Sequence, residues 1–126
     1  MPTAEAAENT GSNITANASK GATKGATREA DGLADAGVPK NTQRIQGATT
    51  YRTPDGWDQI ANNMYEIKSC DNLSLTRQLT DFLNYAKNTP GTNLILYVER
   101  DTNISSNLLE RIVKENVEVR IIPPHE

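Results

Sequence analysis

An apolar run at residues 93–99, Asn-Leu-Ile-Leu-Tyr-Val-Glu, restricts the fold more than any other segment of the chain. Its central side chains are apolar or aromatic, with no alternating polar positions. A strand of this kind is typically buried on both faces, so helices must cover both sides of its sheet. The run is also too short to cross a bilayer, and no other apolar run is longer. We therefore expect an α/β domain with a central sheet flanked by helices.

Two amphipathic segments lie beside this run and supply the expected helices. Residues 74–88 carry apolar side chains at helical spacing, with Asn72 or Ser74 as the expected N-cap. Residues 105–116 predict a second helix of the same kind, and residues 117–122 predict a last strand.

Shorter elements are expected upstream of the first amphipathic segment. Turn-forming residues at 53–56 and 61–63 separate the apolar stretches there. The expected elements are a helix at 27–37 and strands at 43–52, 57–60 and 64–70. The complete order is then α-β-β-β-α-β-α-β, which predicts a mixed sheet with helices on both faces.

The first quarter of the chain differs in composition from the rest. All six aromatic residues lie after position 50, and residues 1–26 consist mainly of Ala, Thr, Asn, Gly and Ser. Such a segment buries too little apolar surface to offset its ordering entropy. We expect residues 1–26 to be a flexible linker or leader and residues 27–126 to form the domain. The start of the chain also has no apolar h-region, so any secretion is expected as part of a larger protein.

The candidate chemistry is concentrated at Asp55, Glu66 and Lys68. Glu66 and Lys68 are two apart, so a strand would place both on one face. Asp55, on the preceding turn or strand, would bring a second carboxylate to them. Two carboxylates can hold a divalent cation, and a nearby lysine can orient or deprotonate a water. This is the layout of a phosphodiester-cleaving site.

Ordinary structural roles compete with this interpretation. Pro-Asp-Gly at 54–56 is a favoured turn triplet, and a Glu-Lys pair is common on an edge strand. Glu66 and Lys68, however, lie on a strand expected inside the sheet, where a pair without a function is costly.

Three further residues are possible contributors to the site. Gln78 follows on the next helix, where its amide could hold a water or a phosphate oxygen. Arg52 could bind a phosphate, and Glu29 could add a third carboxylate. Each of these three could equally be ordinary surface.

Other catalytic classes find no support in the sequence. Cys70 is the only cysteine, which excludes an intramolecular disulfide and a cysteine-based zinc site. His125 is the only histidine and lies next to the end of the given sequence, an unsuitable place for a rigid catalytic base. No glycine-rich loop precedes a helix in a phosphate-binding arrangement.

At these residues the chain resembles a known superfamily. Pro54-Asp55 followed by Glu66-Ile67-Lys68 matches the PD-(D/E)xK pattern of restriction-endonuclease-like nucleases. The flanking segments extend the resemblance to restriction-endonuclease-fold toxin domains, which form the C-terminal ends of contact-dependent inhibition and Rhs-type proteins in bacteria. It covers about residues 38–123, and the expected αβββαβ order agrees with that fold's core.

The resemblance implies a metal-dependent endonuclease toxin that is secreted within a larger effector and acts in the cytoplasm of a competing cell. Asp55, Glu66 and the main-chain carbonyl of Ile67 would bind Mg²⁺ or another divalent metal. Lys68 would position the attacking water, and Gln78 corresponds to a supporting glutamine of such families. The first-helix acidic residue could correspond to Glu29. A cognate immunity protein would neutralise the toxin in the cell that produces it.

The substrate stays open between DNA and tRNA. The net charge of -3 argues against a broad basic nucleic-acid surface. A weak intrinsic affinity for nucleic acid would be consistent with a host protein that presents the substrate. The competing hypothesis is a non-catalytic α/β interaction module, in which Asp55 makes a turn and Glu66 and Lys68 form a structural pair.

Overall fold

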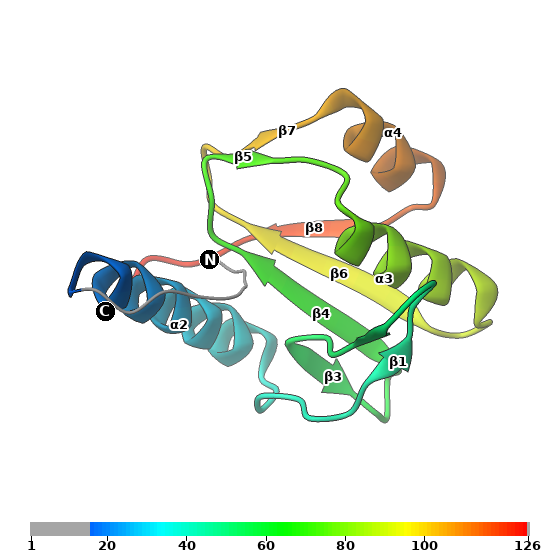
Figure 1. The fold of residues 1–126 in the computed structure, drawn as a ribbon. Helices are drawn as coiled ribbons and strands as arrows, with labels where there is room; N and C mark the ends of the chain where they lie inside the picture. Colours follow the sequence, from blue (N-terminus) through cyan, green and yellow to red (C-terminus); the bar gives the residue numbers. More distant parts are fainter. Residues whose placement is uncertain (1–15, 126) are drawn as a thin grey trace.

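A computed structural model describes the backbone of residues 16–125 and the side chains of residues 25–125. Within this part of the chain the element order is α2-β1-β2-β3-β4-β5-α3-β6-β7-α4-β8 (Figure 1). The helices are α2 (Ala16–Ala36), α3 (Arg77–Asn88) and α4 (Ser106–Lys114). The strands are β1 (Ile45–Gln46), β2 (Tyr51–Arg52), β3 (Gly56–Asp58), β4 (Asn63–Lys68), β5 (Asn72–Leu73), β6 (Asn93–Val98), β7 (Asn103–Ile104) and β8 (Glu118–Ile121).

The central sheet has the strand order β3-β4-β6-β8. β3 pairs antiparallel with β4, whereas β4–β6 and β6–β8 are parallel. This is the mixed α/β sheet that the element order predicts. β6 lies inside the sheet, and all its residues except Asn93 are buried, as the apolar run requires.

Helices cover the two faces of this sheet separately. One face carries α3 and α4, and their apolar stripes pack onto the alternate residues of β4 and β6 that point to them. The opposite face carries α2, with a smaller core of Leu33, Ile67, Tyr97 and Ile122. The core beneath α3 and α4 includes Met64, Leu79, Phe82, Leu83, Leu96, Val98, Leu108 and Ile112.

The first helix is longer than predicted. We expected it at 27–37, but α2 begins at Ala16 and therefore includes part of the expected linker. Alanine is the strongest helix former, so an alanine-rich segment can be helical even where large apolar side chains are absent. Residues 1–15 of that expected linker lie outside the described residues, and the domain boundary at 26/27 stays a prediction.

The single strand expected over residues 43–52 is wrong. These residues form a hairpin of β1 and β2, with the pairs Ile45–Arg52 and Gln46–Tyr51. The Gly47 amide donates to the Thr50 carbonyl over 2.8 Å and closes the turn between them.

Two predicted boundaries near the candidate site also change. α3 begins at Arg77 with Thr76 as its N-cap, not with Asn72 or Ser74. Asn72 is instead part of β5, which pairs with β7. β4 ends at Lys68, not at residue 70, because its neighbour β6 ends opposite it at Val98.

No helix among the described residues is long and apolar enough to span a membrane.

Candidate functional site

Glu66 and Lys68 lie side by side at the C-terminal end of β4. Glu66 is only 2 % exposed, and its Oε2 lies 3.1 Å from the Nζ of Lys68. The two side chains point to the same face of the strand, as their spacing predicts. A buried carboxylate therefore has an ammonium group as its direct partner.

Asp55 reaches this pair from the loop that precedes β3. β3 begins at Gly56, so β4 has no antiparallel neighbour beyond Tyr65. Asp55 fills this position: its Oδ2 accepts a hydrogen bond of 2.8 Å from the amide of Ile67. Its own amide donates to Oε1 of Glu66 over 3.3 Å. The two candidate carboxylates are thus held together at one edge of β4.

The segment after α2 fixes the Asp55 loop. The amide of Asn41 donates to the Asp55 carbonyl over 2.9 Å, and its side-chain Nδ2 donates to the Pro54 carbonyl over 2.9 Å. Lys40 forms an isolated antiparallel bridge with Gly56. The position of Asp55 therefore depends on the chain that connects it to α2, in addition to its own turn.

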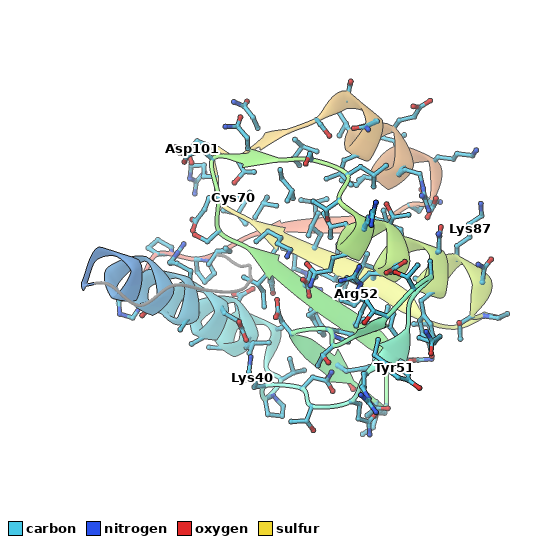
Figure 2. The ribbon with its side chains drawn as sticks, viewed as in Figure 1. Lys40, Tyr51, Arg52, Cys70, Lys87 and Asp101 are labelled. Carbon is cyan, nitrogen blue, oxygen red and sulfur yellow. The ribbon has the colours of Figure 1, made fainter. Side chains whose placement is uncertain are left out.

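That connection also brings Glu29 to the cluster. Oε2 of Glu29 lies 2.5 Å from Nζ of Lys40, whose side chain is marked in Figure 2. The charge of Glu29 helps to raise the pKa of Asp55, so the three carboxylates share one electrostatic environment. The sequence interpretation missed Lys40, because nothing in its local pattern indicates that its loop returns to Gly56.

Gln78 also reaches the cluster, from the second residue of α3. The ammonium group of Lys68 donates to Oε1 of Gln78 over 2.6 Å. Lys68 is thus held between a buried carboxylate and an amide oxygen.

Arg52 is directed elsewhere. Its Nε donates to Oδ2 of Asp81 over 2.8 Å, and Asp81 is a buried residue of α3. In this arrangement the guanidinium anchors β2 to α3 and does not join Asp55 and Glu66.

The surroundings of Asp55 and Glu66 favour the protonated forms of these two carboxyl groups. Burial and the neighbouring Glu66 and Glu29 charges raise the pKa of Asp55 well above its ordinary value, against the opposing effect of the Ile67 amide and Lys68. Burial also raises the pKa of Glu66, although Lys68 lowers it in part. The Lys40 ammonium loses hydration, but Glu29, Asp55 and Glu66 more than compensate and raise its pKa. Perturbed carboxyl groups gathered at one place are typical of functional sites.

The donor set fits one oxygen-ligated divalent cation. Among residues 25–125, no group of three or more His, Cys, Asp or Glu side chains is arranged to hold a metal. Mg²⁺ commonly needs only one or two carboxylates, because water and substrate phosphate complete its coordination. The Ile67 amide points to Asp55, and the carbonyl of a strand residue points to the same side as its amide. Asp55, Glu66 and that carbonyl therefore offer oxygens at one edge.

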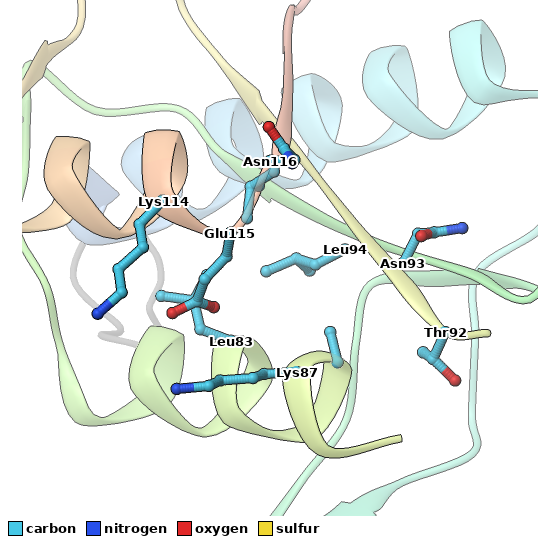
Figure 3. A pocket seen from close by; sticks show the side chains of 10 residues that line it. Leu83, Lys87, Thr92, Asn93, Leu94, Lys114, Glu115 and Asn116 are labelled. Carbon is cyan, nitrogen blue, oxygen red and sulfur yellow. The ribbon is translucent and has the colours of Figure 1, made fainter. Parts of the chain in front are cut away.

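A cavity of about 330 Å³ lies away from this cluster (Figure 3). Its lining includes Lys87 near the end of α3, Leu94 near the start of β6 and Lys114 at the end of α4. In the parallel register Asn63 pairs with Asn93 and Lys68 with Val98. The cavity therefore lies at the opposite end of the sheet from Glu66 and Lys68, and none of the candidate residues lines it.

Comparison with known families agrees with this fold. The sequence model of the family described as restriction endonuclease fold toxin 7 matches residues 23–108, well over half of the chain. No curated protein and no solved structure matches the chain. The chain belongs to this restriction endonuclease fold toxin family, which confirms the predicted family and the α/β fold class.

Proposed function

We propose that this toxin domain is a metal-dependent endonuclease that cleaves phosphodiester bonds of DNA or tRNA in a competing bacterium. The single observation that carries the proposal is the juxtaposition of Asp55, Glu66 and Lys68 at one edge of β4. Membership of the restriction endonuclease fold toxin family supports it. Burying two carboxyl groups beside each other destabilises a fold, so their presence together favours a chemical role.

The residues divide into two roles. Asp55, Glu66 and the carbonyl of Ile67 would hold Mg²⁺ or another divalent metal, which would supply Lewis-acid stabilisation of the phosphate. Lys68 would position the attacking water and offset the negative charge that develops on the phosphate. Gln78 fixes the orientation of Lys68 through its 2.6 Å hydrogen bond.

Glu29 and Arg52 have less direct roles in this proposal. Glu29 contributes negative charge near Asp55 and is balanced by Lys40. Arg52 positions the hairpin that leads into the Asp55 loop, through its ion pair with Asp81.

Membership of a toxin family supports the following biological setting. A toxin of this kind would be secreted within a larger effector, act in the cytoplasm of the target cell and be neutralised by a cognate immunity protein. The net charge of -3 is consistent with a host protein that presents the nucleic acid. Full activity on purified substrate without an added factor would refute the role of the host protein and leave the rest of the proposal intact.

Cleavage assays test the chemistry. The purified chain is incubated with plasmid DNA or total tRNA, in Mg²⁺ or in EDTA, beside Glu66→Gln and Lys68→Ala. We expect metal-dependent cleavage by the wild type and at least a hundredfold loss in each variant, since each removes a group that acts on the phosphate. Ile60→Ala, at a fully exposed turn residue, is the matched control and should retain activity. No cleavage of either substrate, together with no toxicity on expression inside a bacterium, would favour a non-catalytic interaction module.

Metal binding can be measured without activity. Mg²⁺ or Mn²⁺ should raise the thermal unfolding midpoint of the wild type, because a ligand that binds only the folded state stabilises it. The variants Asp55→Asn and Glu66→Gln should lose most of this shift. An equal shift in all three proteins would place the ion somewhere other than these carboxylates.

A further inference from the structure

The β1–β2 hairpin is anchored more firmly than its short strands alone would allow. The buried Asp81 of α3 accepts from Nε of Arg52 over 2.8 Å and from the amide of Ala48 over 3.1 Å. Gly47 permits this approach: a Cβ at that position would lie 2.4 Å from Oδ2 of Asp81 and 2.6 Å from the Thr50 carbonyl oxygen. A carboxylate that is only 7 % exposed therefore holds the hairpin in one orientation.

This anchored hairpin presents an aromatic ring to solvent. Tyr51 is 55 % exposed, and the Cζ of the exposed Arg44 lies 4.1 Å from its ring centre. Figure 2 marks Tyr51 beside Arg52, the residue that holds the strand to α3. The guanidinium covers one face of the ring, and the exposure of Tyr51 leaves much of the ring open.

The hairpin and the proposed catalytic cluster are both bound to α3. Gln78, which holds Lys68, and Asp81, which holds the hairpin, are three residues apart on α3. Side chains at this spacing are neighbours on a helix, with Cβ atoms about 5–6 Å apart. The chain also runs directly from Tyr51 through Arg52 to the Asp55 loop. Arg52, the residue after the exposed ring, and Lys68 of the cluster are thus held by the same turn of one helix.

We propose that Tyr51 and Arg44 form a stacking platform for an unpaired nucleobase, so that the domain takes single-stranded nucleic acid into its site. The inference rests on the proposed nuclease function and specifies its substrate class. Aromatic rings and guanidinium planes both stack on bases, and the positive charge of arginine attracts the phosphate backbone of the nucleic acid. Bases inside a duplex are stacked on each other and cannot use such a platform. Single-stranded DNA and RNA share the chemistry that the platform recognises.

Direct binding tests the platform separately from catalysis. The chain carrying Glu66→Gln, in EDTA, is titrated against fluorescein-labelled 12-mers of single-stranded RNA, single-stranded DNA and the corresponding duplexes. We expect tighter binding to one or both single strands than to the duplexes. Adding Tyr51→Ala should weaken single-strand binding at least about fivefold, while Tyr51→Phe keeps it within about twofold. Arg44→Ala should weaken binding and reduce its salt dependence.

The controls distinguish a platform from a merely structural pair. Ile60→Ala, in the turn that follows β3, should bind like the parent, and thermal melts should show that every variant is folded. If Tyr51→Ala changes only the melting temperature, or if duplexes bind as tightly as single strands, the inference is overturned. Absence of any single-strand binding overturns it as well. If Tyr51-dependent binding is seen but the wild-type chain cleaves nothing, the nuclease proposal fails while the platform stands.

Discussion

At the scale of single residues, hydrogen bonds hold the two carboxyl groups of the candidate site close together, although burial and like charge disfavour their ionised forms. Asp55 and Glu66 are connected through the Asp55 amide, yet burial and the charge of Glu66 both raise the pKa of Asp55. Lys68 stabilises the charged form of Glu66 through a direct ion pair. The charged form of Asp55 is stabilised by the hydrogen bond from the Ile67 amide and by more distant positive charge. The least compensated group in the cluster is therefore Asp55.

The free energy of unfolding of the metal-free protein should therefore depend on pH through Asp55. Because the folded-state pKa of Asp55 is raised above its ordinary value of 3.8, the folded protein binds this proton more tightly than the unfolded chain. This group's contribution to stability is then lost as pH rises above about 4 toward the folded pKa. Asp55→Asn removes that loss and can still accept from the Ile67 amide. We expect the variant to gain stability relative to the wild type as pH increases, measured by urea unfolding in EDTA.

Magnesium provides the control for this pH effect. A cation bound at the carboxylates favours their charged forms, so adding Mg²⁺ should reduce the pH-dependent difference between the two proteins. A difference that stays constant from about pH 4 to pH 8 in EDTA would contradict the raised pKa of Asp55.

At the scale of elements, periodicity predicted the core well and the connections poorly. The apolar run of β6 and the stripes of α3 and α4 were readable because burial fixes their spacing. β5 and β7 were not, since each has two residues and exists only through pairing with the other. The same holds at the site: the spacing of Glu66 and Lys68 indicated one face, but Lys40 joins through a long-range bridge to Gly56 that leaves no local pattern.

The N-cap of α3 is a further case in which the structure selects one residue from several good candidates. Oγ1 of Thr76 accepts from the Leu79 amide over 3.1 Å and starts the helix just before Gln78. Thr76→Ala should lower the free energy of unfolding by about 1 kcal/mol, measured by urea denaturation. Ser105→Ala is the matched control, because Ser105 is the N-cap of α4 but makes no side-chain capping bond. Equal losses in both variants would show that the Thr76 hydroxyl does not act as a cap.

At the scale of the whole molecule, Arg28 helps to tie α2 to the end of the central sheet. Arg28 donates to both carboxylate oxygens of Glu99, at 2.9 and 2.8 Å, and to the Pro123 carbonyl at 2.8 Å. It also pairs with Asp31 on its own helix. These bonds join α2, the residue after β6 and the segment after β8. Arg28 therefore helps to position the helix that carries Glu29.

Removing Arg28 should destabilise the packing of α2 against the sheet. Arg28→Ala removes a guanidinium that donates to Glu99, Asp31 and the Pro123 carbonyl, so we expect a loss of roughly 2 kcal/mol or more in unfolding free energy. Amide hydrogen exchange along α2 should accelerate at the same time. Arg28→Lys should recover only part of the loss, because lysine lacks the planar fork. The exposed Arg100→Ala is the control and should stay within about 0.5 kcal/mol of the wild type. Unchanged exchange in α2 would show that Arg28 is not needed to hold this helix in place.

The shared use of α3 by the cluster and the hairpin sets a limit on insertions and deletions in this chain. One residue added between Gln78 and Asp81 would rotate the second relative to the first by about 100°. The helix could then face Lys68 or Arg52, but not both. The loop after α3 carries no such constraint, because it lies at the far end of the sheet. Length changes should therefore be tolerated around Pro90 and eliminated between Gln78 and Asp81, an outcome that a library of single-codon insertions would reveal directly.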